Sequence, residues 1–130
     1  MVTGTLSSVL WMALGLGTAA IATVQSNNDD DSRMVEAVLA GDANAFRGLV
    51  ENYQGRIYNI IYGMVHNRED ALELTQDSFI KAYKKIDTFR LGTKFYTWLC
   101  RIAVNTTIDF IRKQKHRQTI SFEEGIGVQA

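Results

Sequence analysis

The sequence of 130 residues contains no proline and a single cysteine, Cys100. One cysteine cannot form an intramolecular disulfide, and no cysteines and histidines stand at the spacing of metal ligands, so a disulfide framework and a zinc module are excluded. The absence of proline, together with only ten glycines, disfavours a β-sandwich and favours long helices joined by short loops. The single cysteine fits a reducing compartment. The length suits one domain and excludes a large enzyme.

Residues suited to catalysis are also scarce. His66 and His116 have no serine, cysteine or carboxylate placed to complete a pair of nucleophile and base. Gly15 and Gly17 lack the strand and helix that give a phosphate-binding loop its meaning. We therefore predict that the chain is not an enzyme and uses neither a cofactor nor a metal ion.

The net charge is zero, but the two signs are separated along the chain. Residues 1–78 contain four Lys/Arg and ten Asp/Glu, whereas residues 79–117 contain ten Lys/Arg and two Asp/Glu. A basic block of this density is expected where a protein meets phosphates, and the acidic half then needs a different partner. A solvated helix face is the alternative explanation of the basic block.

An apolar leader precedes the helical part. No charged residue occurs from Val2 to Val24, a length that could just span a bilayer. Three interpretations are open: a weak membrane anchor, a poor signal peptide, or an extension upstream of a domain that starts near Met34. We favour the extension, because nothing later in the chain looks exported. Residues 26–32 look like a polar linker.

Apolar residues at steps of three and four from Met34 onward predict an all-α fold, a compact bundle of about four helices behind a leader that can itself be helical. Gly41 ends the first helix, Asp42 caps the second and Asn67 caps the third. A loop over 87–94 turns at Gly92, Thr93 caps the fourth helix, and the basic run to 117 ends it. The predicted divisions are a leader (1–28), a helical domain (29–117) and a tail (118–130).

Aromatic and basic residues alternate between 89 and 98. Trp98 shares a helical face with Phe95 and is expected in the core, whereas Tyr96 and Phe89 lie elsewhere and at least one of them is expected to be exposed. Exposed rings between cations are typical of proteins that hold unstacked bases of single-stranded nucleic acid. A hydrophobic anchor for the loop is the alternative for any one ring.

The chain resembles region 2 of bacterial RNA polymerase sigma factors of the extracytoplasmic-function (ECF) group. The motifs that carry the resemblance are DSFIKAYKKIDTFR (77–90), FYTWLCRIAVN (95–105), DFIR (109–112), GDANAF (41–46) and NREDA (67–71). It departs from the family pattern at Leu91, which intervenes before Gly92, and at Gly55, where proline is frequent. The second, helix-turn-helix domain of the family has no counterpart up to Ala130.

The resemblance implies two binding faces. The face toward RNA polymerase core, at the clamp helices of the largest subunit, falls on Asp70, Glu73, Leu74, Gln76, Asp77, Phe79 and Lys81. The face toward the single-stranded −10 region of promoter DNA falls on Phe89, Arg90, Lys94, Phe95, Tyr96, Trp98, Arg101, Asn105, Asp109, Arg112 and Lys113. The implied function is promoter melting in the cytoplasm. The alternative is a membrane-anchored or truncated module, held through residues 2–24, that binds polymerase or an anti-sigma factor without starting transcription.

Overall fold

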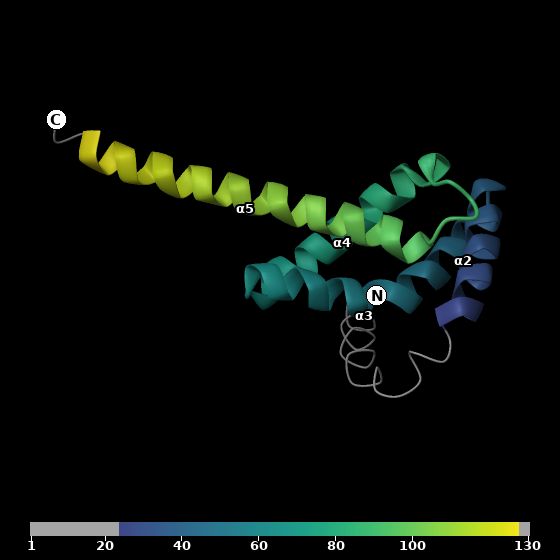
Figure 1. Cartoon of the computed structure of the whole chain (residues 1–130). Helices are drawn as coiled ribbons and strands as arrows, with labels where there is room; N and C mark the ends of the chain where they lie inside the picture. The colour runs from purple at the N-terminus through teal and green to yellow at the C-terminus, as the bar shows by residue number, and fades with distance from the viewer. Residues whose placement is uncertain (1–23, 128–130) are drawn as a thin grey trace.

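The computed structural model describes residues 24–127, with side chains over 29–125. The elements are α2 (Val24–Leu39), α3 (Ala43–Val65), α4 (Arg68–Lys84), the short 3-10 helix η1 (Ile86–Thr88) and α5 (Phe95–Gly127) (Figure 1). No strand occurs in the part of the chain described. The predicted all-α bundle of four helices is confirmed.

The predicted helix boundaries around α3 follow from capping. The Asp42 carboxylate accepts a hydrogen bond from the Asn44 backbone N–H at 3.0 Å, and the Asn67 side chain accepts one from the Asp70 N–H at 2.9 Å. His66 adopts a left-handed conformation with φ of 54° and separates α3 from α4. These side-chain oxygens satisfy N–H groups that the first turn of a helix leaves without partners.

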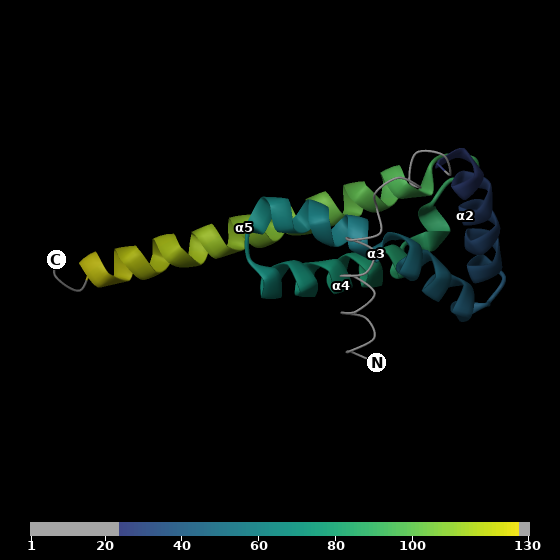
Figure 2. The ribbon, with the colours of Figure 1, turned by 90° about the horizontal axis from the view of Figure 1, so that it is seen from below.

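The core lies where α3 and α4 pack against the N-terminal half of α5. Leu49 and Ile57 of α3 and Leu99 of α5 are fully buried there, and each such side chain contributes about 1.5–3 kcal/mol. Helix α2 packs against α3 and lies across the bundle near the start of α5, as Figure 2 shows from below. Val35 is its fully buried contact with the core.

Two expectations about the ends of the bundle are wrong. Residues 26–32 are not a linker, because α2 begins at Val24 and Asp31 is buried in the bundle. The fourth helix does not end at 117, because α5 continues through Gly127, and no proline interrupts it. Residues 112–125 of α5 are exposed and extend away from the bundle (Figure 1).

The leader interpretations concern residues 1–28, of which 1–23 lie outside the described residues. Among the helices that the structure does describe, none has the length and apolar character needed to span a membrane.

Candidate nucleic-acid interface

The loop between η1 and α5 is built around one glycine and one inward-facing ring. Gly92 has φ of 93°, a conformation that side chains with a Cβ rarely adopt. The Thr93 hydroxyl donates to the Arg90 carbonyl at 2.7 Å. Thr93 therefore forms its hydrogen bond within the loop. The expectation that it caps the next helix is wrong, because a cap at Thr93 requires a helix that begins at Lys94, whereas α5 begins at Phe95.

Three aromatic rings pack together beneath this loop. The ring centroids of Phe89 lie 5.5 Å from Phe95 and 5.3 Å from Trp98, and those of Phe95 and Trp98 lie 5.6 Å apart. Phe89 is 5% exposed and Phe95 is 1% exposed, whereas Trp98 is half-buried. The expected exposure is thus reversed: Phe89 belongs to the core, and Trp98 is the ring that reaches the surface.

Tyr96 is half-buried and packs toward α3 instead of standing free. Its ring stacks on Tyr53 with a centroid distance of 5.2 Å and an interplanar angle of 22°. The Arg56 guanidinium lies 5.5 Å from its centroid. Burial, with a smaller effect of Cys100, raises the pKa of Tyr96 to about 12. Tyr96 therefore presents one face to α3 and is not the freely exposed ring that the sequence suggested.

A pocket of about 470 Å³ opens beside Trp98, within the range of about 300–1,000 Å³ typical of small-molecule sites. Three cationic side chains, three threonines and Trp98 line it, namely Thr88, Arg90, Thr93, Lys94, Thr97, Trp98 and Arg101. The Thr88 hydroxyl donates to the Lys85 carbonyl at 2.6 Å, so its oxygen remains available as an acceptor. No group of metal-ligating residues occurs among those described. An aromatic surface surrounded by cations and hydroxyls suits a planar, anionic ligand.

The remaining predicted DNA contacts continue along α5. Asn105, Asp109 and Arg112 are exposed, and Lys113 is exposed one residue further. Arg101, Asn105, Asp109 and Lys113 are spaced four residues apart, so their side chains form one strip that winds gradually around the helix. They do not line the pocket itself.

The residues predicted to bind polymerase divide into an exposed group and a buried group. Glu73, Gln76 and Asp77 are exposed on α4, Asp70 is half-buried, and the exposed Lys81 lies with its ammonium group 3.3 Å from the Thr106 hydroxyl of α5. Leu74 and Phe79 are 4% and 6% exposed. These two side chains hold α4 in the core and are not part of its accessible surface.

Comparison with known proteins identifies the domain. The model of the family described as sigma-70 region 2 matches residues 49–117, which is more than half of the chain. The chain belongs to the sigma-70 region 2 family. Loop 89–94 and the pocket beside Trp98 both lie within the matched range of this region 2 domain.

Individual relatives agree with that assignment and with the resemblance to the ECF group. The chain is 45% identical over 83 residues to the ECF RNA polymerase sigma factor SigW of Bacillus subtilis, covering 64% of this chain and 44% of the relative. It is 44% identical over 87 residues to the ECF RNA polymerase sigma-E factor of Haemophilus influenzae, covering 67% and 46%. The chain thus spans less than half the length of these relatives.

A solved structure also matches this region 2 domain. It is an NMR structure of an engineered region 2 of sigmaE in complex with GTAAAA, with a TM-score of 0.64 and 40% sequence identity. The match covers 67% of this chain and 90% of the other.

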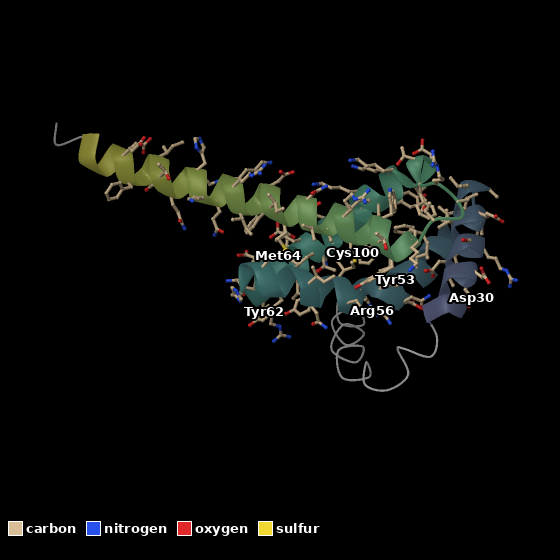
Figure 3. The ribbon with its side chains drawn as sticks, viewed as in Figure 1. Asp30, Tyr53, Arg56, Tyr62, Met64 and Cys100 are labelled. Atoms are coloured by element: carbon tan, nitrogen blue, oxygen red, sulfur yellow. The ribbon has the colours of Figure 1, made fainter. Side chains whose placement is uncertain are left out.

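Sequence reasoning missed one group of residues beside the site. The Tyr53 hydroxyl of α3 donates a hydrogen bond to the buried Asp31 carboxylate of α2, and the Arg56 guanidinium lies 5.9 Å from the Tyr53 ring. Figure 3 shows Tyr53, Arg56 and Cys100 where α3 runs beside the start of α5. An available signal was the spacing of Tyr53 and Arg56, which at three residues apart share a helical face.

Proposed function

We propose that this region 2 domain acts in transcription initiation by binding RNA polymerase core and holding the non-template strand of the promoter −10 element as single-stranded DNA. The observation that carries the proposal is the pocket, in which Trp98 lies among Arg90, Lys94 and Arg101. Single-stranded DNA binds to such surfaces because bases stack on the aromatic ring while cations follow the phosphates. The domain contributes binding energy and is not itself an enzyme in this proposal.

Trp98 is the residue proposed to receive an unstacked base. One side of its ring packs on Phe89 and Phe95, which fixes its orientation before DNA arrives. A base leaves the duplex at a cost of a few kcal/mol, and a stack on an aromatic ring returns about 1–3 kcal/mol. The prearranged ring therefore favours the open strand over the duplex.

Arg101 and Lys94 are proposed to hold the phosphates on either side of that base. Both are exposed and both line the pocket. The strip from Asn105 to Lys113 is proposed to extend the contact along the strand, with Asp109 excluding phosphate locally. The relative of known structure was solved with the oligonucleotide GTAAAA, which supports a short single strand as the ligand class.

The second partner is proposed to bind the exposed side of α4. Glu73, Gln76 and Asp77 lie on one helical face, together with Ile80, which is 52% exposed. An exposed aliphatic side chain within a polar rim is the usual composition of a protein interface. We assign this face to the clamp helices of the polymerase largest subunit, with Leu74 and Phe79 supporting it from below.

The proposal is tested by fluorescence anisotropy with labelled GTAAAA, measured with the full chain at several salt concentrations, with and without polymerase core. The unsubstituted chain should bind the oligonucleotide, and raising the salt concentration should weaken this binding. Replacing Arg101 by glutamine should reduce the salt slope by about 0.7, the value for one phosphate contact on a single strand. Lys115→Gln makes the same charge change on the exposed extension of α5 and should leave the slope unchanged.

Two results would contradict the proposal in different ways. Binding that does not respond to salt would remove the phosphate contacts. Core binding without any oligonucleotide binding would instead indicate the alternative, an interaction module that engages polymerase or an anti-sigma factor without opening promoters.

A further inference from the structure

Asp31 of α2 is a carboxylate in the core. It is 1% exposed, and it is the only carboxyl group, and the only acidic or basic side chain apart from tyrosine, among the buried residues of the part described. Burying a charge is costly unless it is hydrogen-bonded, and its bonded partner is the hydroxyl of Tyr53, which is 4% exposed. Burial raises the pKa of the Asp31 carboxyl, although the Tyr53 hydrogen bond opposes the increase. An apolar pair could fill this space without that cost, so the polar pair calls for an explanation.

Tyr53 connects α2 to the first turn of α5. Its ring stacks on Tyr96 at 5.2 Å and lies 5.9 Å from Phe95, between centroids. The Arg56 guanidinium lies 5.9 Å from the Tyr53 ring and 5.5 Å from the Tyr96 ring, within the distance of a cation–π interaction. One tyrosine therefore contacts both residues that begin α5.

The ring contacts continue from Phe95 to the pocket. Phe95 lies 5.6 Å from Trp98, and Trp98 lines the pocket with Arg90, Lys94 and Arg101. An unbroken series of side-chain contacts thus leads from a buried carboxylate in the first described helix to the ring proposed to stack on a base. The hydroxyl anchor matters because a tyrosine held only by ring packing can still tilt. A hydrogen bond at its far end fixes the direction of the long axis of the Tyr53 ring, while the stack on Tyr96 holds the ring plane.

We propose that Asp31 and Tyr53 are positioning residues for the DNA pocket: their hydrogen bond fixes the Tyr53 ring, which holds the first turn of α5 and thereby the orientation of Trp98. The inference rests on the proposed function, in which Trp98 receives the base. Neither residue touches the pocket, so both act through Phe95 and Tyr96. Helix α2 is accordingly part of the DNA-binding architecture.

The test uses the full chain with four substitutions. Tyr53→Phe removes the hydroxyl and Asp31→Ala removes its acceptor, and each should weaken GTAAAA binding by about three- to tenfold, the effect of one hydrogen bond. Asp31→Asn keeps an acceptor oxygen for the Tyr53 hydroxyl, so the affinity of this variant for GTAAAA should stay within about twofold of that of the unsubstituted chain. The matched variant is Ser78→Ala, which removes another buried hydroxyl, bonded to the Leu74 carbonyl at 2.7 Å, and should leave DNA affinity unchanged.

A second measurement reports on the pocket without DNA. In a Trp11→Phe background Trp98 is the only tryptophan, because the chain has two. Tyr53→Phe and Asp31→Ala should make its fluorescence easier to quench with acrylamide, whereas Asp31→Asn and Ser78→Ala should not.

The outcomes separate the two proposals. If the unsubstituted chain does not bind the oligonucleotide, the proposed function fails, and the quenching series still decides whether the pair positions Trp98. If the chain binds DNA but Tyr53→Phe and Asp31→Ala leave both affinity and quenching unchanged, the positioning role is overturned. Equal losses of DNA binding and core binding in both variants would also overturn it, because the pair would then only stabilise the fold.

Discussion

Replacing Trp98 by alanine should separate DNA binding from stability in this domain. The substitution removes the ring that lines the pocket, and loss of one base stack costs about 1–3 kcal/mol. This range corresponds to roughly a 5- to 150-fold weaker Kd for GTAAAA. Because Trp98 is only half-buried, its loss should destabilise the fold by less than the ~3–5 kcal/mol typical of a fully buried aromatic residue.

Phe89→Ala is the matched variant, since Phe89 contacts Trp98 from the core side. At 5% exposure it should lose the full ~3–5 kcal/mol, which lowers the Tm of a domain of this size by at least about 12 °C. Anisotropy with labelled GTAAAA, run well below the lower Tm, gives the affinities, and circular dichroism gives the melting curves. Trp98→Phe should retain part of the affinity, because it retains a ring.

With polymerase core present, the same variants can be followed by permanganate footprinting of unpaired thymines. Trp98→Ala should leave closed-complex formation nearly intact and slow strand opening, since stacking is gained only after a base leaves the duplex. Unchanged opening and unchanged GTAAAA affinity in a folded Trp98→Ala protein would refute the assignment of this ring to base stacking.

Three further outcomes are expected. Asp77→Ala and Ile80→Asp should weaken binding to polymerase core without changing circular dichroism, whereas Asp87→Ala, which removes another exposed carboxylate, in η1, should not weaken it; undiminished core binding in a pull-down by both α4 variants would refute the assignment of the α4 face. Because burial raises the pKa of Asp31 above 3.8, the stability that its protonated form contributes is lost as pH rises through the folded-state pKa; the Tm of Asp31→Asn should therefore rise relative to that of the unsubstituted chain as the pH increases above about 4, and a constant difference would contradict this. Because folding raises the pKa of Tyr96 from 10.0 to about 12, the stability that its protonated hydroxyl contributes is complete below pH 10 and is lost toward pH 12. The Tm of the unsubstituted chain should therefore fall further over that interval than the Tm of Tyr96→Phe, and parallel melting curves that fall equally would contradict this.

Most of the helical bundle could be predicted from the sequence because its signals are local. Asp42 and Asn67 cap helices through contacts within three residues, and the apolar periodicity of α3 matches its buried side chains. The cationic part of the pocket was also predictable, since Arg90, Lys94 and Arg101 follow from charge clustering and family resemblance.

The orientation of the rings could not be predicted in the same way. Phe89 lies outside the long helices, so helical periodicity cannot predict which way its side chain points. It follows η1 and precedes the turn at Gly92, and in this loop its ring faces the core. The N-terminal half of α2 was missed because Asp29, Asp30 and Asp31 look like a solvated linker, whereas its apolar second half was predicted as the first helix. Only the position of Tyr53, 22 residues away in sequence, makes Asp31 a core residue, and a contact over that separation leaves no periodic trace.

The location of Asp31 determines how far the N-terminus of the domain can be shortened without loss of a buried hydrogen bond. A polypeptide initiated at Met34 would retain Val35 and Val38, the apolar contacts of α2, but would lack the acceptor for the Tyr53 hydroxyl. A buried hydroxyl without a partner costs about 1–3 kcal/mol. The shortest recombinant version of this domain that keeps its internal hydrogen bonding therefore begins before Asp31, with enough residues ahead of it to form the preceding turn of α2.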